Sequence, residues 1–142
     1  MQCYFCTTHK KILVICTGNS CRSQMAHGFL KQNPDLAVYS AGIETHGVNP
    51  MAVEVMKEVG IDISDHSSDL IDKYMEIDFD LIITVCDHAR ENCPYFPSRA
   101  QRIHHSFPDP AAATGSQSSI KNEFRAVRDM IQETMKEIEK TY

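Results

Sequence analysis

The residues best suited to chemistry lie in one short segment, in which Cys16 is followed six positions later by Arg22 and then by Ser23. A loop that curls from a strand into a helix aims successive backbone N–H groups at one point and so binds an anion. Arg22 adds a planar fork that matches two oxygens of a tetrahedral oxyanion. The same positive field favours the thiolate of Cys16 at neutral pH, and Ser23 can donate a hydrogen bond to it. The pattern predicts a nucleophilic cysteine beneath a bound oxyanion.

The rest of this predicted oxyanion-binding loop consists of Thr17, Gly18, Asn19, Ser20 and Cys21. We expect Gly18 to provide the positive φ angle that the curl requires. Asn19 would hold the loop through side-chain hydrogen bonds, and we interpret Cys21 as structural. The alternative is a buried structural cysteine beside a surface arginine. The position of the segment between an apolar run and a helix favours the anion-binding loop.

A candidate proton donor, Asp109, lies between two prolines in the segment His105–Ala111. Displacing an oxygen from a tetrahedral oxyanion requires a proton, and a carboxyl group on a rigid loop can supply it. Most Asp-Pro pairs are simply turns. On residue types alone a turn is favoured, and a general acid is the alternative.

Two further cysteines, Cys86 and Cys93, enclose a polar segment that follows an apolar run. If that segment is helical, seven residues separate the two Cα atoms by about 10.5 Å. A disulfide needs roughly 4.4–6.8 Å, so the segment is either a loop or unwinds on oxidation. Two alternatives remain: a pair of inert buried cysteines, or a zinc site made by Cys86, His88 and Cys93.

Alternating strands and helices must position these groups. The predicted strands are Lys11–Cys16, Leu36–Ser40, Phe79–Val85 and Arg102–Phe107. Helices are expected after the loop up to Asn33-Pro34, from Asn49-Pro50 to Gly60, briefly at Asp69–Met75, and from Ser118-Ser119 onward. This order predicts a single-domain, three-layer α/β fold with a four-stranded parallel sheet and helices on both faces. Ligands of such sheets bind beyond the carboxyl ends of the strands, so residues 16–23, 86–93 and 107–113 should share one rim.

The composition of the chain argues against several classes of function. The chain has 142 residues and a net charge of −5, which argues against a nucleic-acid binder. Its longest apolar runs are too short to span a membrane, and residues 1–11 lack the apolar core of a signal peptide. Six cysteines without such a signal favour a reducing, cytoplasmic compartment. We expect residues 1–10 to be a short N-terminal extension and residues 11–142 to be the domain. The extension contains Cys3 and Cys6, separated by two residues, and we interpret this pair as incidental, with a weak metal-binding or redox role as the alternative.

Three segments, CTGNSCRSQMA, TVCDHARENCP and FPDPAAATG, resemble the thioredoxin-coupled arsenate reductases that are built on the low-molecular-weight tyrosine phosphatase fold. The resemblance runs from about Lys11 to the C-terminus. It implies that Cys16 attacks arsenate held by residues 17–23, with Arg22 as the clamp and Asp109 as the general acid. It further implies that Cys86 then attacks Cys16 to release arsenite, that Cys93 moves the disulfide to Cys86–Cys93, and that thioredoxin reduces it.

The resemblance implies no organic cofactor, arsenate as the substrate with phosphate or sulfate as competitors, thioredoxin as the partner, and a monomer. Relatives of this kind commonly carry Glu where this chain has His27, and in some of them that residue helps to bind potassium. Asn19, Ser40 and Asp65 remain as oxygen donors, but with His27 we predict no bound cation.

Two rival functions follow. One is a low-molecular-weight protein-tyrosine phosphatase acting through a phosphocysteine, whose members usually place an aromatic residue after Asp-Pro. Here Ala111, Ala112 and Ala113 follow instead, which favours the reductase. Weak phosphatase side activity is expected in either case. The other rival is a non-catalytic module that binds arsenite or an oxyanion.

Overall fold

The structure, a computed structural model, describes residues 9–93 and 100–142. The predicted extension, residues 1–10, therefore falls almost entirely outside the described residues, as do Cys3 and Cys6. The first strand already begins at Lys10, which pairs with Leu36.

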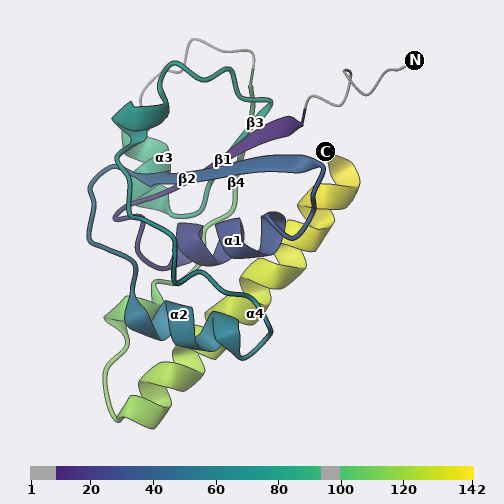
Figure 1. The fold of residues 1–142 in the computed structure, drawn as a ribbon. Coiled ribbons are helices and arrows are strands. Elements are labelled where there is room, and N and C mark those ends of the chain that lie inside the picture. Colours follow the sequence, from purple (N-terminus) through teal and green to yellow (C-terminus); the bar gives the residue numbers. More distant parts are fainter. Residues whose placement is uncertain (1–8, 94–99) are drawn as a thin grey trace.

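Four parallel strands form the central sheet, in the order β2-β1-β3-β4 (Figure 1). They are β1 (Lys10–Cys16), β2 (Leu36–Gly42), β3 (Leu81–Thr84) and β4 (Gln101–His104). The two central strands are buried on both faces, as their continuous apolar runs predict. The third and fourth strands are shorter than predicted, although the N–H of Phe107 still donates to the carbonyl of Val85 at 3.1 Å.

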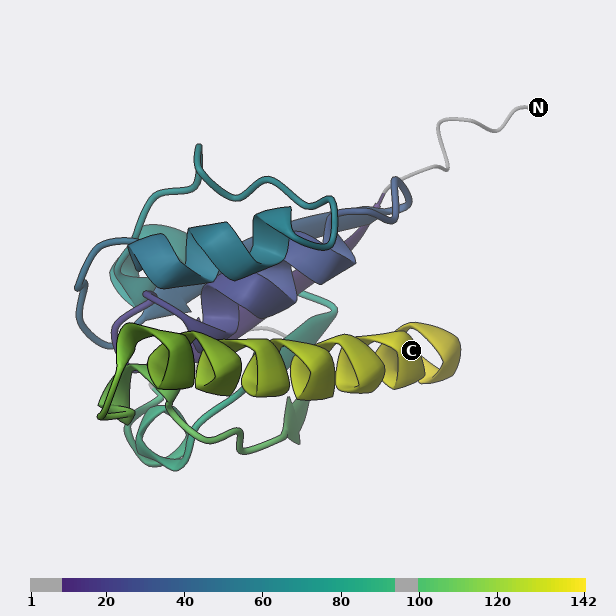
Figure 2. The same ribbon diagram turned by 90° about the horizontal axis from the view of Figure 1, so that it is seen from below.

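Helices cover both faces of the sheet, which confirms the predicted fold class. They are α1 (Arg22–Leu30), α2 (Pro50–Lys57), α3 (Asp87–Asn92) and α4 (Gln117–Thr141), with 3₁₀ turns η2 (Ile71–Tyr74) and η3 (Pro110–Ala112). Helices α1, α2 and α4 lie together on one side (Figures 1 and 2). On the other face Tyr39 of β2 packs edge-on against Tyr74 of η2 and Phe79, with ring centroids 5.2 and 5.4 Å apart.

Local sequence signals explain where helices begin and end. The side chain of Asn49 accepts a hydrogen bond from the N–H of Met51 at 2.8 Å, and Pro50 is the first residue of α2. Gly60, with a φ of 82°, ends that segment as predicted. Helix α4 begins slightly before the predicted position, because Ser116 caps it by accepting from the N–H of Ser119.

The register of the sheet determines which loops meet. Ile15 of β1 pairs with Thr84 of β3, so two residues farther along Thr17 lies opposite Cys86. Neighbouring strands are about 4.8 Å apart, which brings the two loops into contact at the carboxyl edge of the sheet. Within the described part of the chain, none of the helices combines the length and the apolar character needed to cross a membrane.

Candidate functional site

The loop after β1 is held from outside through its backbone carbonyls. Donors from the segment after β2 bind them as follows: Ile43 N to Cys16 O (3.2 Å), Glu44 N to Thr17 O (2.9 Å), His46 N to Gly18 O (3.0 Å) and Asn49 N to Ser20 O (3.0 Å). In a trans peptide the C=O and the following N–H point in opposite directions. The N–H groups of the loop therefore face its inner side, where an anion binds.

The curl of the loop depends on Asn19, which has a φ of 48°. The prediction that Gly18 supplies the positive φ angle is wrong, because Gly18 is not among the described residues with such an angle. Gly18 leaves room for a side chain instead: a Cβ atom there would lie 2.3 Å from Nδ1 of the exposed His46, whose ring would have to move. Asparagine tolerates the left-handed region better than most residues, which explains its place in the loop.

A chain of hydrogen bonds leads from Asn19 to the sulfur of Cys16. The amide of Asn19 donates to the hydroxyl of Ser23 at 2.7 Å, and that hydroxyl lies 2.9 Å from Sγ of Cys16. Because the oxygen of Ser23 accepts from Asn19, its proton is available for the sulfur. All three side chains are buried, so water does not compete for these hydrogen bonds.

Arg22 joins the loop to the segment that carries Asp109. Its Nη1 donates to the carbonyl of Phe107 at 3.1 Å, and its Nη2 lies 3.8 Å from Oδ2 of Asp109. Asp109 also accepts from the N–H of Ala111 at 3.0 Å, and its side chain is 45% exposed. The carboxyl group is thus held at the rim of the loop yet open to water.

These residues enclose a cavity of about 160 Å³. Its lining consists of Cys16, Thr17, Gly18, Ser20, Cys21, Arg22, His46, Asp109 and Ala111. A tetrahedral oxyanion fits this volume, and the guanidinium and the carboxyl groups line the same space as the sulfur. The predicted nucleophile Cys16, the guanidinium of Arg22 and the predicted proton donor Asp109 therefore surround one cavity.

Cys21 shares the cavity but not the chemistry of Cys16. Burial raises the pKa of its thiol to about 12, although the hydroxyl of Ser20 acts in the opposite direction. Cys21 is therefore protonated at neutral pH and is not a nucleophile there.

The second cysteine, Cys86, lies beside the loop. Its Sγ is 3.2 Å from the hydroxyl of Thr17 and accepts from the N–H of Ala89 at 3.4 Å, which makes Cys86 the N-cap of α3. Contacts from Thr17 and from the first turn of α3 therefore hold the sulfur of Cys86 next to the loop. The predicted proximity of the loops after β1 and β3 is thus observed as a direct contact.

The third cysteine, Cys93, follows the last residue of α3. Nη1 of Arg102 donates to its Sγ at 3.7 Å. Burial raises the pKa of Cys93, and Arg102 partly opposes that effect. Among the described residues, no three His, Cys, Asp or Glu side chains gather as metal ligands, so Cys86, His88 and Cys93 do not form the alternative zinc site.

The residues around His27 do not fit a potassium site. Nδ1 of His27 lies 2.8 Å from the hydroxyl of Ser40, and its ring lies 4.3 Å from that of His66. The side-chain oxygen of Asn19 accepts from the N–H of Asp69 at 2.8 Å. The side-chain oxygens of Asn19 and Ser40, two of the candidate potassium ligands, are therefore hydrogen-bonded within the protein. At position 27 the chain has an imidazole instead of the carboxylate that the resemblance leads one to expect.

The buried imidazole of His27 should make stability depend on pH. Burial lowers its pKa from 6.5 to about 3, so below pH 6.5 the unfolded chain takes up a proton that the folded chain does not. The stability contributed by the neutral ring is complete above pH 6.5 and is lost as the pH falls toward 3. We expect His27→Gln to reduce the loss of unfolding free energy between pH 7 and pH 5 by about 2 kcal/mol. Urea unfolding of both proteins at the two pH values measures this, and equal losses would contradict it.

Several supporting residues were not predicted from the sequence. Gln24 is fully buried, and its amide donates to the carbonyls of Asn19 and Ser67 at 3.0 and 2.9 Å. Gly42 lies so near the loop that a Cβ atom would be 2.9 Å from the carbonyl oxygen of Thr17. The signal for Gln24 was present, since it is a polar residue next to the apolar side of α1, whereas nothing in the sequence pairs Gly42 with the loop.

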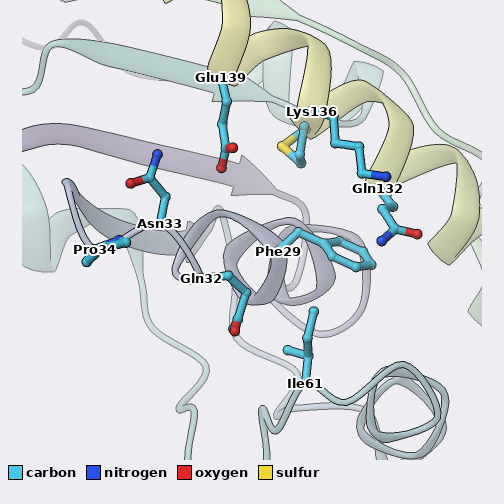
Figure 3. Close-up of a pocket in the computed structure, with 9 residues that line it drawn as sticks. Phe29, Gln32, Asn33, Pro34, Ile61, Gln132, Lys136 and Glu139 are labelled. Carbon is cyan, nitrogen blue, oxygen red and sulfur yellow. The ribbon is translucent and has the colours of Figure 1, made fainter.

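A larger cavity, of about 370 Å³, lies between the C-terminal end of α1 and α4 (Figure 3). The ring of Phe29 points toward α4 across it, while Lys136 and Glu139 extend from α4. It is at the end of α1 opposite the anion-binding loop, and it brings none of the cysteines together. The smaller cavity is therefore the candidate active site.

Comparison with known proteins agrees with this geometry. An arsenate reductase of Staphylococcus aureus (strain Newman) is 55% identical over 126 residues, which cover 87% of this chain and 92% of the relative. An arsenate reductase of Halalkalibacterium halodurans is 50% identical over 134 residues, which cover 93% and 96%. A solved structure of an arsenate reductase in the phosphate binding state superposes with a TM-score of 0.72 at 33% identity, covering 91% of this chain and 95% of that one. The family model for low molecular weight phosphotyrosine protein phosphatases matches residues 11–141, and the chain belongs to that family.

Proposed function

We propose that this protein is an arsenate reductase whose domain comprises residues 11–142. The observation that carries the proposal is the contact between Thr17 and Sγ of Cys86, which places a second thiol next to the loop of the first. A phosphatase needs only the first thiol. A reductase needs a neighbour that can remove the sulfur from its arsenic adduct, and the names of the two bacterial relatives support this choice.

The proposed reaction begins with arsenate in the cavity above Cys16. The thiolate forms a bond to arsenic while one oxygen leaves as water, with Asp109 supplying a proton. Cys86 then attacks Sγ of Cys16, and the electron pair of the sulfur–arsenic bond stays on arsenic, which leaves as arsenite. The arsenic gains two electrons, and the two sulfurs lose them in forming a Cys16–Cys86 disulfide.

The next step regenerates Cys16. Cys93 attacks Cys86, a disulfide forms between them, and Cys16 leaves as a thiolate. We propose that thioredoxin supplies the two electrons and two protons that reduce Cys86–Cys93, that the protein works in the cytoplasm and that it is a monomer. These conditions are consistent with cysteines that remain reduced between turnovers.

A single-turnover thiol count tests the proposal. Reduced protein, freed of reductant, is mixed with arsenate, and arsenite, free thiols and disulfide-linked peptides are measured. We expect two thiols to disappear for each arsenite, with Cys86 joined to Cys93. Binding of arsenite without consumption of arsenate would indicate the binding module, and hydrolysis of a phosphate ester with no thiol loss would indicate the phosphatase.

Asp109→Asn should slow formation of the arsenic adduct by about 10²-fold, because the amide cannot supply the proton for the departing oxygen. Arsenate binding should change little, since the loop N–H groups and Arg22 remain. Rapid-quench measurement of single-turnover arsenite formation at saturating arsenate gives the rate. An unchanged rate would remove Asp109 from the role of general acid.

A further inference from the structure

Helix α3 separates the two cysteines that must pair at the end of the proposed reaction. Cys86 caps its first turn, and Cys93 follows its last residue. Across an intact helix their Cα atoms are about 10.5 Å apart, whereas a disulfide requires roughly 4.4–6.8 Å. The helix has to open before Cys86 and Cys93 bond, so the contacts that hold α3 closed influence that step.

One of those contacts joins His104 to two residues that flank Cys86 in the sequence. Nε2 of His104, in β4, lies 2.9 Å from Oδ1 of Asp87, and Nδ1 lies 2.7 Å from the hydroxyl of Thr84. Thr84 is two residues before Cys86, and Asp87 is the residue after it. Since a carboxylate only accepts hydrogen bonds, Nε2 of His104 is the donor to Asp87. We call Thr84, His104 and Asp87 the histidine clamp.

The clamp differs from the other polar contacts of the helix. Arg90 lies 3.9 Å from Asp87 and the amide of Asn92 donates to the carbonyl of His88, so both contacts stay within α3. Asp87 reaches β4 and the residues that follow it: the hydrogen bond from His104 is the main cause of the lowered pKa of its carboxyl group, and a hydrogen bond from the side chain of Ser106 contributes less. The carboxyl side chain is 60% exposed and the imidazole 20%, so the bond lies near the surface, where it can break without moving the core.

Cys93 lines one cavity together with two members of the clamp, Thr84 and His104. A space of about 280 Å³ is bordered by Thr84, Arg90, Cys93, Arg102 and His104, together with Ile82 and Ile103. Cys93 therefore already faces the side of the sheet on which His104 holds Asp87. Part of the clamp and Cys93 thus border the same space, on the side of the sheet where β4 lies.

We propose that His104 is a positioning residue that holds Cys86 toward Cys16 for the first exchange and must release Asp87 before Cys86 pairs with Cys93. The inference rests on the proposed relay of three thiols. His104 bonds to no sulfur. It acts in the step where the thiolate of Cys93 attacks Cys86, the bond between Cys86 and Cys93 forms, the bond between Cys16 and Cys86 breaks, and Cys16 leaves as a thiolate with no net change in electrons.

Loss of the histidine clamp should therefore favour the disulfide between Cys86 and Cys93 and slow formation of the disulfide between Cys16 and Cys86. Without His104 the reduced helical form loses a contact that the oxidised form does not make. The equilibrium for reduction of Cys86–Cys93 then falls about tenfold, which makes the potential about 30 mV more negative. In the Cys93→Ser background, by contrast, formation of the Cys16–Cys86 disulfide after adding arsenate should slow about tenfold, because Cys86 is no longer held toward Cys16.

The first experiment measures the potential in the full chain carrying Cys16→Ser, which prevents exchange between Cys86 and Cys16 and needs no arsenate. The protein is equilibrated in dithiothreitol redox buffers, alkylated, and the Cys86–Cys93 peptide is quantified by mass. His104→Ala is compared with His104→Gln, whose amide can still donate to Asp87, and with His88→Ala, an exposed histidine on the same helix. We expect the full shift for His104→Ala, a smaller one for His104→Gln and none for His88→Ala.

Two outcomes overturn the inference in distinguishable ways. Equal potentials in His104→Ala and its parent would remove the clamp while leaving the relay intact. Failure of the parent to form Cys86–Cys93 at all would contradict the relay itself. If His104→Ala does not fold, Asp87→Ala breaks the same contact from the exposed side, and the double variant should shift no further than the larger single change.

Discussion

Cys93→Ser is expected to release one arsenite per chain and then stop. Cys16 and Cys86 complete the first exchange without Cys93, so the first turnover proceeds and leaves a Cys16–Cys86 disulfide. The hydroxyl of the introduced serine cannot attack that disulfide. Because Cys16 is buried, thioredoxin does not reach its sulfur directly. Steady-state reduction with thioredoxin should therefore fall by at least about 10²-fold, while the initial burst keeps its amplitude.

Quenched-flow arsenite analysis and peptide mapping measure this result together. Cys21→Ser is the matched control, because Cys21 is a buried thiol in the same cavity that is protonated at neutral pH. The control should show continued turnover. Sustained turnover of Cys93→Ser with thioredoxin would contradict the assignment of Cys93 as the last thiol of the relay.

Cys86→Ser should abolish arsenite release altogether, including the first turnover. The Cys16 adduct forms, but no thiol lies beside Thr17 to remove the sulfur from arsenic. Loss of an attacking nucleophile costs roughly 10³-fold or more, and here no other described thiol occupies its position. Hydrolysis of a small phosphate ester should change little, because the loop, Arg22 and Asp109 are unaltered.

The pair of assays separates the two chemistries that the fold supports. Loss of arsenite release with retained phosphatase side activity would assign Cys86 to the redox step alone. Loss of both activities would mean that Cys86 supports the loop through its contact with Thr17. Retention of arsenite release in Cys86→Ser would refute the proposed relay at its second step.

Much of the fold followed from local signals in the sequence. Asn49, Pro50 and Gly60 mark the two ends of one helical segment, and each does so through backbone geometry that the residue type itself favours. The parallel sheet followed from the alternation of elements. Because parallel strands share a carboxyl edge, the meeting of Thr17 with Cys86 and of Arg22 with Asp109 was predictable in outline.

The missed features depend on contacts between segments distant in the sequence. The close approach at Gly18 is to the side chain of His46, and the need for glycine at position 42 arises from the return of the chain past the backbone of the loop. Likewise His104 and Asp87 are seventeen residues apart, and only the register of β3 with β4 makes them neighbours. A pattern of residue types does not contain such distances.

The protonated state of Cys21 has a consequence for the release of product. Arsenic in its lower oxidation state binds strongly to thiolates, as soft metal ions do. An ionised Cys21 in this cavity would bind arsenite as it leaves and so inhibit the next turnover. In the proposed relay Cys16 is in a disulfide when arsenite leaves, and burial, by raising the pKa of Cys21 to about 12, keeps the other sulfur of the cavity protonated. The proposed relay therefore releases arsenite into a cavity that offers it no thiolate.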